Sequence, residues 1–249
     1  MTKTTKYYGL PFIFLSLAFL LIWQSFHYVI PILVPTPLGT LETLFRKFNL
    51  ILYHLPYTVI ISVGGIALSL VMAFLFAIPM QLFKSFEHAM MPWLVILQAV
   101  PFIALGPLLL AALGYGVAAK ICVTALLCYF PIFLGLNEGM TQVNNAQLKT
   151  LLSLGLSQYQ IMLHLRLPNA LPRLFTGIRM SVSWVFSAAI LSEFLGAQRG
   201  LGFLIKSASR SFDNELVFAG LIVITILSLL LFMLTKWCER KLTPWHKNI

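Results

Sequence analysis

One loop between two apolar stretches holds the residues with the clearest chemical use. It covers residues 145–172 and contains Gly155 and, thirteen residues later, Pro168. Gly155 suits the left-handed residue that ends a helix, while Ser157 and Gln160 form a capping-box pattern that starts another. The second helix should end before Pro168, because proline disfavours a helical residue in front of it. The loop is therefore expected to hold two short helices joined at a glycine.

The apolar side chains of this loop point to docking rather than to catalysis. Exposed leucines would be costly in water, and a patch of this kind marks an interface. The alternative is that these side chains pack on helices of the same chain. If they are exposed, Gly155 and its neighbours form a surface for a soluble partner; the apolar residues concerned are Leu151, Leu152, Leu154, Leu156 and Met162.

A second candidate group lies on the apolar stretch that follows the loop. Arg179 and Glu193 are fourteen residues apart, which is about 21 Å along a helix, so they cannot pair within one helix. Ionisable residues at membrane depth are costly and often functional. We take Trp184, Glu193 and Arg179 as candidates to line or gate a pathway. Glu193 could instead contact Lys120 or a partner subunit, or be a simple interfacial charge.

The sequence lacks the patterns of an enzyme or of a metal protein. It contains no G-x-x-x-x-G-K-[ST] phosphate loop. Cys122, Cys128 and Cys238 show no metal-binding spacing. An intramembrane hydrolase would need a nucleophile and a base at depth, and no Gly-x-Ser-Gly run is present. We therefore expect a non-catalytic chain without a cofactor or metal of its own.

The elements that position these residues are membrane helices. The chain is 59% hydrophobic and only 10% charged, whereas about a quarter of a soluble domain is charged. A helix needs about 20 apolar residues to cross a bilayer, and lipid forces backbone groups to pair within each span. We predict an all-α membrane protein with one domain over residues 1–249 and about six spans, near 10–30, 58–80, 93–113, 120–137, 174–194 and 216–235.

The distribution of Lys and Arg predicts the orientation of these spans. With the amino terminus inside, eleven of these residues face the cytoplasm and six face outward, which favours both termini and the 145–172 loop inside. The first span could be a cleaved signal peptide, because Lys3 and Lys6 precede it. Its apolar run is long for a signal peptide and no small-x-small site follows, so we expect it to remain.

An additional helix is expected between the first two spans. Thr36 can cap a helix and Pro37 suits its first position. Apolar residues then recur at helical spacing, which predicts an amphipathic helix on the outer interface. The same pattern also fits an amino-terminal extension of the second span.

Several motifs together resemble a known family. The Gly155–Pro168 spacing is similar to the "EAA" loop of permease subunits of type I binding-protein-dependent ABC importers. The resemblance extends from about residue 35 to 245 and is closest to the nitrate, sulfonate, taurine and pyrimidine-precursor branch. The motifs that carry it are residues 100–109, 120–121, 130–132, 155–168, 170–172, 176–179, 192–197 and 200–205.

This resemblance implies a fold, a mechanism and partners. The fold would be that of a type I importer permease in a bacterial inner membrane, and a second copy of the permease would form a homodimer with it. Cytoplasmic ATPase subunits would bind ATP and grip the loop, and an extracytoplasmic binding protein would deliver substrate. The coupling residues would be Lys149, Thr150, Leu151, Gly155, Leu156, Leu165 and Pro168. The family's Glu-Ala-Ala triplet falls on 149–151, where the acidic residue is missing.

The resemblance also suggests substrates. Residues 213–220 and 240–245 are similar to permeases for the aminopyrimidine precursor of thiamine. The alternative within the family is a sulfonate, taurine or nitrate importer. Outside the family, a secondary carrier or channel remains open. Either would work without an ATPase, so co-purification with one separates these cases.

Overall fold

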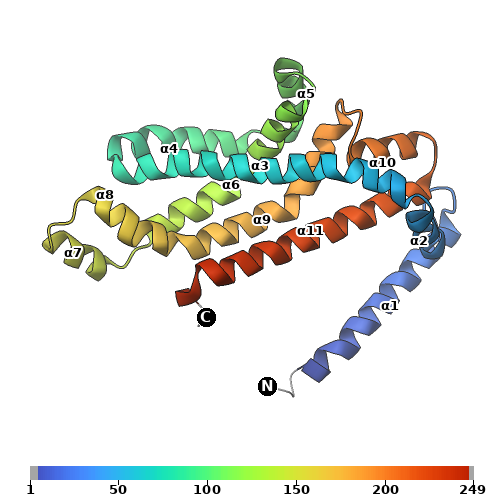
Figure 1. Cartoon of the computed structure of the whole chain (residues 1–249), viewed down its shortest axis with the longest axis horizontal. Coiled ribbons are helices and arrows are strands. Elements are labelled where there is room, and N and C mark those ends of the chain that lie inside the picture. Colours follow the sequence, from blue (N-terminus) through green and yellow to red (C-terminus); the bar gives the residue numbers. More distant parts are fainter. Residues whose placement is uncertain (1–4, 247–249) are drawn as a thin grey trace.

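Apolar runs separated by glycine and proline fold into helices throughout the computed structural model, which describes residues 5–246 (Figure 1). The all-helical prediction is confirmed. Lys3 and Lys247, which contribute to the charge count, lie outside the described residues. Among those described, four helical stretches are long and apolar enough to cross a membrane: α3 (Phe48–Leu82), α6 (Val117–Thr141), the continuous run Gln158–Phe194 and α11 (Asn214–Leu242).

The other helices are shorter or less uniformly apolar. Pro101 lacks an N–H and keeps Val100 extended, at ψ 124°, so the expected span 93–113 is divided between two helices. The remaining elements are α1 (Thr5–Val29), α2 (Pro37–Arg46), α4 (Lys84–Ala99), α5 (Phe102–Leu113), α7 (Asn145–Ser153), α8 (Gln158–Ile161), a π-helical segment (Met162–Arg166), α9 (Leu167–Phe194), α10 (Leu201–Arg210) and a 3₁₀ turn (Pro244–His246).

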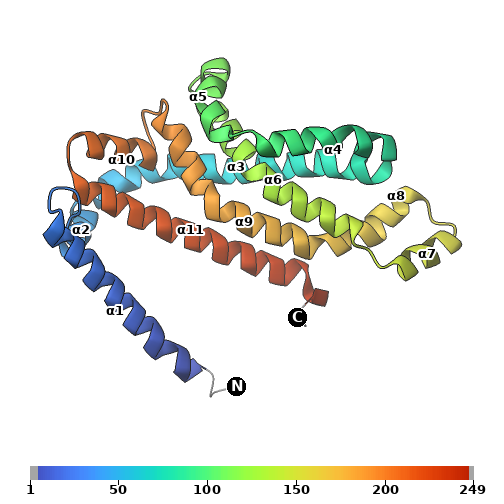
Figure 2. The same ribbon diagram turned by 180° about the vertical axis from the view of Figure 1, so that it is seen from behind.

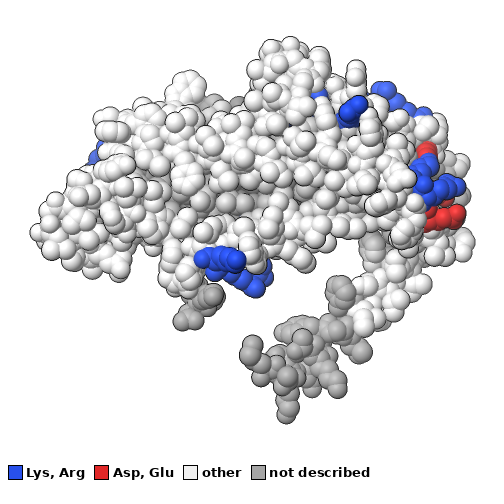
Figure 3. Space-filling model, viewed as in Figure 1, with Lys and Arg blue, Asp and Glu red and all other residues white. Residues whose placement is uncertain are grey.

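The long helices lie side by side and define two ends of the molecule. Helices α2 and α10 lie at one end, called the α10 end, and α7 and α8 lie at the other, called the α7 end (Figures 1 and 2). Helix α1 diverges from the bundle in both views. One face is almost free of charge in its middle, with Lys and Arg gathered near the end of α11 and around α2 and α10 (Figure 3).

Helices α6 and α9 form the centre of the bundle because glycines let their backbones approach closely. A Cβ on Gly139 would lie 2.6 Å from the Ala170 Cα, and one on Gly177 would lie 3.0 Å from the Ile132 Cα. Small residues of this kind are how membrane helices pack tightly without a hydrophobic driving force between them. This pair therefore sets the frame on which α3 and α11 pack.

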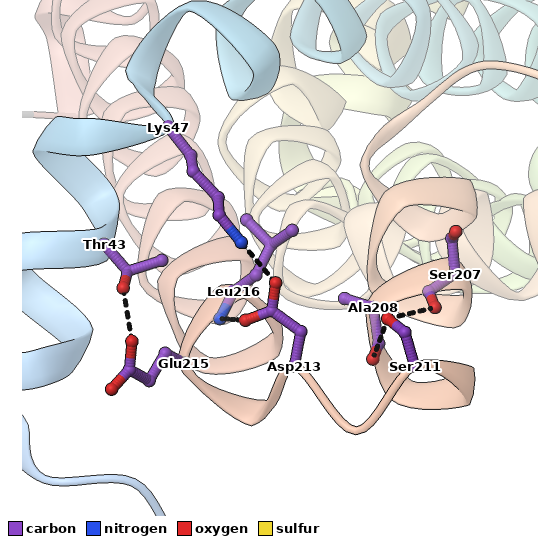
Figure 4. A network of polar contacts seen from close by, with 8 residues as sticks. All are labelled: Thr43, Lys47, Ser207, Ala208, Ser211, Asp213, Glu215 and Leu216. Carbon is purple, nitrogen blue, oxygen red and sulfur yellow. Dashed lines mark hydrogen bonds and ion pairs between the residues drawn. The ribbon is translucent and has the colours of Figure 1, made fainter.

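A network of polar contacts ties α2 to the start of α11 at the α10 end (Figure 4). Lys47 forms an ion pair with Asp213, and the Thr43 hydroxyl donates a hydrogen bond of 2.6 Å to Glu215. Asp213 also accepts a 3.2 Å hydrogen bond from the Leu216 backbone N–H, which caps α11. The network explains why α2 stays with the bundle although α1 leaves it.

Helix α2 begins as predicted but does not merge with the second span. The Thr36 side chain accepts from the Gly39 N–H, and Pro37 takes the first helical position. Lys47 then leaves the helical conformation, at φ −102° and ψ 20°. Helix α3 starts at Phe48, ten residues before the predicted span, so α2 is a separate helix and α3 is longer than expected.

We predict that Gly139→Ala destabilises the detergent-solubilised chain. The added side chain meets the backbone of Ala170, and overpacking of this kind costs about 1–3 kcal/mol. Thermal unfolding followed by circular dichroism measures the change. Gly106→Ala is the matched control, because its Cβ would meet only the flexible end of Leu195, at 3.2 Å. Equal melting temperatures for the two variants would contradict the close contact.

Candidate functional site

The loop between α7 and α8 has the glycine joint that the sequence predicts. Gly155 has φ +76°, the left-handed conformation, and nothing lies within 4 Å of where its Cβ would be. The capping box is also confirmed: the Ser157 N–H donates to Gln160 Oε1 at 2.8 Å, and the Gln160 N–H donates to Ser157 Oγ at 3.3 Å. Local sequence therefore fixes the sharp turn between the two helices.

The apolar side chains named for this loop are only partly exposed: Leu152 and Leu154 are exposed, Leu151 and Leu156 are half-buried, and Met162 is buried. Leu154 is 69% exposed, and Leu152, Tyr159 and Leu163 are exposed as well. We call these four residues the loop patch. Tyr159 and Leu163 escaped the sequence analysis, although both recur at helical spacing after Ser157. Of the predicted coupling residues, Lys149, Thr150 and Gly155 are exposed, while Leu151, Leu156, Leu165 and Pro168 are half-buried.

The prediction that the second loop helix ends before Pro168 is wrong. Helix α8 continues through the π-helical segment into α9, and the Leu167 N–H bonds to the Met162 carbonyl. A proline ring in an α-helix clashes with the carbonyl four residues earlier, whereas a π-turn widens the helix locally. The loop is thus joined to the membrane through one helical run, Gln158–Phe194.

Glu193 lies in a closed hydrogen-bond network at the α10 end. Its side chain is 1% exposed. Glu193 Oε1 accepts from the Thr58 hydroxyl at 2.7 Å, and Oε2 accepts from the Gly202 N–H at 2.6 Å. Thr58 in turn accepts from the Leu201 N–H at 2.7 Å. The carboxylate therefore caps the start of α10 and joins α3, α9 and α10.

Lys120 and a glycine complete the surroundings of Glu193. Lys120 is fully buried, donates to the Tyr115 carbonyl and interacts electrostatically with Glu193. Gly200 has φ +116°, and its Cα packs so closely on the carboxyl group that no side chain would fit. A direct contact between Lys120 and Glu193 was foreseen as one alternative, but no ion pair joins them among the described residues. The described geometry gives Glu193 a structural position without exposure to a pathway.

The other two pathway candidates lie in different surroundings. Arg179 forms an ion pair with Glu239 of α11 and donates to the Thr176 hydroxyl at 3.0 Å. The charge of Arg179 is therefore neutralised by an ion pair between α9 and α11. Trp184, by contrast, is 68% exposed and lines a cavity of about 310 Å³. The cavity is lined by Leu127, Trp184, Ser187, Ala188 and Leu191.

Trp184 belongs to a mixed polar and apolar stripe on α9. Met180, Ser183, Trp184 and Ser187 are all exposed and follow helical spacing; we call them the α9 stripe. On α3, the exposed residues between 60 and 75 are all apolar: Ile60, Val63, Ala67, Val71 and Leu75. The α3 face suits lipid, whereas hydroxyl groups and an indole suit a less apolar neighbour.

Comparison with known families gives one clear match. Residues 65–244 match the family described as "Binding-protein-dependent transport system inner membrane component". The "Formylaminopyrimidine transport permease protein ThiX" of Halalkalibacterium halodurans is 33% identical over 93% of this chain and 94% of its own length. The "Taurine transport system permease protein TauC" of Escherichia coli is 32% identical over 76% of this chain and 70% of its own length.

The fold also matches that of solved transporters. A chain of the inward-facing MetNI methionine ABC transporter superposes with a TM-score of 0.70 at 16% identity, over 80% of this chain and 98% of its own length. A chain of an amino acid ABC transporter gives 0.63 at 15% identity, over 82% and 97% respectively. At such low identity these likenesses concern the fold alone.

We predict that Glu193→Gln lowers the melting temperature of the solubilised chain. One carboxylate oxygen becomes an amide group that faces a hydrogen-bond donor, and an unsatisfied buried donor costs about 1–3 kcal/mol. Glu138→Gln is the control. Glu138 pairs with Arg173 at 3.2 Å while both side chains stay about half exposed, so its loss should cost about 0–1 kcal/mol. Unchanged unfolding of Glu193→Gln would show that the network contributes nothing.

Proposed function

This chain belongs to the binding-protein-dependent transport system inner membrane components, and we propose that it forms the translocation pathway of an ATP-driven importer. It is an ABC permease of the nitrate, sulfonate and taurine branch and a multi-pass inner membrane protein. It is a non-catalytic subunit. In this proposal, cytoplasmic ATPase subunits bind the nucleotide, and an extracytoplasmic binding protein delivers the cargo.

The observation that carries this proposal is the exposed loop patch, of which Tyr159 and Leu163 lie on the helical run Gln158–Phe194. The apolar surfaces of Leu154 and Tyr159 are exposed to water, which is unfavourable. They are therefore available to bind in a groove on a partner. The predicted coupling residues Lys149 and Thr150 are exposed beside them. With the loop at the α7 end in the cytoplasm, both termini are inside, in agreement with the excess of Lys and Arg on that side.

The α9 stripe is the proposed pathway wall. Trp184 and the hydroxyl groups of Ser183 and Ser187 would be poorly placed against lipid. A second copy of the permease facing this stripe would enclose a polar route between the two chains. Trp184 therefore remains assigned to the pathway. We no longer assign Glu193 and Arg179 to it, because their side chains are engaged in bonds within the chain.

The proposed cargo is an aminopyrimidine precursor of thiamine. Similarity to a formylaminopyrimidine permease over nearly the whole chain supports this choice. The α9 stripe carries no charged side chain, and the flat indole of Trp184 suits a neutral planar ring. A sulfonate such as taurine is the alternative, supported by the similarity to a taurine permease. An anionic sulfonate would favour a cationic wall.

Purification of the complex from detergent-solubilised membranes tests the proposal. We expect an ATPase and a binding protein to co-purify, and ATP hydrolysis to rise when the binding protein is loaded. Calorimetry with formylaminopyrimidine, taurine and nitrate then identifies the ligand. Recovery of the chain without any ATPase would overturn the importer and favour a secondary carrier.

We predict that Leu154→Asp abolishes ATPase co-purification while the chain still inserts. A carboxylate at this exposed position would have to be desolvated in the partner's groove, which costs several kcal/mol. Quantitative pull-down measures the loss. Leu242→Asp, at an exposed leucine near the end of α11, is the control and should bind normally. Equal recovery of ATPase with both variants would exclude the loop patch as the dock.

We predict that Trp184→Ala slows transport of formylaminopyrimidine without loss of the ATPase. Stacking of a heteroaromatic ring on an aromatic side chain contributes about 1–3 kcal/mol, so the uptake rate should fall about fivefold or more. Uptake into proteoliposomes measures the effect. Trp237→Ala is the control, because Trp237 is exposed on α11 and contacts Lys241. Normal uptake by Trp184→Ala would remove Trp184 from the pathway.

A further inference from the structure

Four polar residues form a compact network at the α7 end. Arg166 Nη1 donates to Gln81 Oε1 at 2.5 Å and lies 3.4 Å from the Gln81 backbone carbonyl. The Gln81 amide donates to Asn137 Oδ1 at 3.0 Å and to Thr141 Oγ1 at 2.9 Å. We call Arg166, Gln81, Asn137 and Thr141 the Arg166 clasp.

The clasp brings together the ends of three helical elements. Arg166 is the last residue of the π-helical segment, Gln81 lies one residue from the end of α3, and Thr141 ends α6. The last carbonyls of a helix lack intrahelical donors and carry partial negative charge. Among the ion pairs of residues 5–246, none involves Arg166. Its charge is thus directed to the end of α3.

The clasp is the connection that reaches α3 at this end. Helix α9 has further connections to α6, because Asn169 donates to the Gly139 and Gln142 carbonyls at 3.0 and 3.1 Å, and Arg173 pairs with Glu138. Within the described residues, the side-chain bond that joins α3 to the start of this helical run is the one between Arg166 and Gln81. Loss of Arg166 would therefore remove the direct bond between this helical run and α3, while α3 stays hydrogen-bonded to Asn137 and Thr141 of α6.

The packing beneath the clasp permits movement. Met80, Met140 and Met162, one from each of the three elements, are almost fully buried in the same hydrophobic cluster. Methionine is flexible and adapts to altered packing. Such a joint can rotate while it stays filled, so the hydrogen bonds of the clasp decide which helices move together. A π-helical turn in a long helix often marks a functional site of this kind.

We propose that the Arg166 clasp transmits loop movement to α3. The loop helix α8 and the membrane helix α9 belong to one helical run, and a displacement at the loop patch is carried along that run to Arg166. Through Gln81, the clasp makes the end of α3 follow that displacement. Arg166 is thus a positioning residue, and this role rests on the proposed ATPase coupling.

Spin labels in the complete complex with ATPase and binding protein test this role. In a background without Cys122, Cys128 and Cys238, Ser153→Cys reports the loop and Phe83→Cys reports the end of α3; both positions are exposed. Distances between labels on the two permease copies are compared without nucleotide and with trapped ATP. When the clasp is unaltered, the distances from both labelled sites should change on ATP binding. In Arg166→Met, the loop site should shift normally and the α3 site should shift less, because only the indirect connection through α6 remains.

Two further variants make the result decisive. Gln81→Leu breaks the same bond and also the bonds to Asn137 and Thr141, so it should reduce the α3 shift at least as much as Arg166→Met. Arg173→Met removes an exposed arginine about two helical turns further along the same run and should leave both shifts intact. Formylaminopyrimidine uptake per ATP hydrolysed should fall about fivefold or more in the two clasp variants, the usual range of a coupling effect.

The results distinguish failure of the Arg166 clasp from failure of the proposed importer function. A full α3 shift in Arg166→Met or Gln81→Leu overturns the clasp, as does failure of both variants to assemble, which would make the clasp a folding element. An absence of any ATPase or of any loop shift in the unaltered complex overturns the proposed function instead. Reduction of the α3 shift alone supports transmission through Arg166.

Discussion

The close contact between α6 and α9 is the constraint on which the rest of the structure depends. Gly139 and Gly177 leave so little space that the two backbones touch. In lipid, no hydrophobic force holds helices together, so close packing and hydrogen bonds must do so. Helices α3 and α11 pack on this pair, and α9 carries both the loop at one end and the Glu193 network at the other. Changes in α9 therefore affect both sides of the membrane.

The two ends of the α9 helical run differ in kind. At the α10 end, Glu193 is enclosed by Thr58, Gly200 and Gly202. Its bonds are short, buried and satisfied, which makes that end rigid. At the α7 end, the partly buried Arg166 clasp lies over flexible methionines. A helical run with one rigid and one flexible end can convert a displacement of the loop into a tilt of α9.

Local sequence predicted the features that depend on neighbouring residues. The joint at Gly155 and the box of Ser157 and Gln160 are set within a few positions, and both were foreseen. The enclosure of Glu193 depends on Thr58, which lies 135 residues away, and no local pattern reveals it. The prediction that the loop helix ends before Pro168 was wrong, because a π-helical turn accommodates the proline ring. Pro101, in contrast, did break its helix, and its effect could have been read from the sequence.

The order of residues around Glu193 has a consequence for biosynthesis. Glu193 lies near the end of α9 rather than at its centre, where an unpaired acid would cost about 2.5–3.5 kcal/mol to insert, but a buried carboxylate there still needs partners. The chain grows from its amino terminus, so Thr58 is already made when Glu193 leaves the ribosome. Gly202 follows only nine residues later. The acid thus meets its partners almost as soon as it is synthesised, and the membrane need not hold it alone while the last helix is still being made.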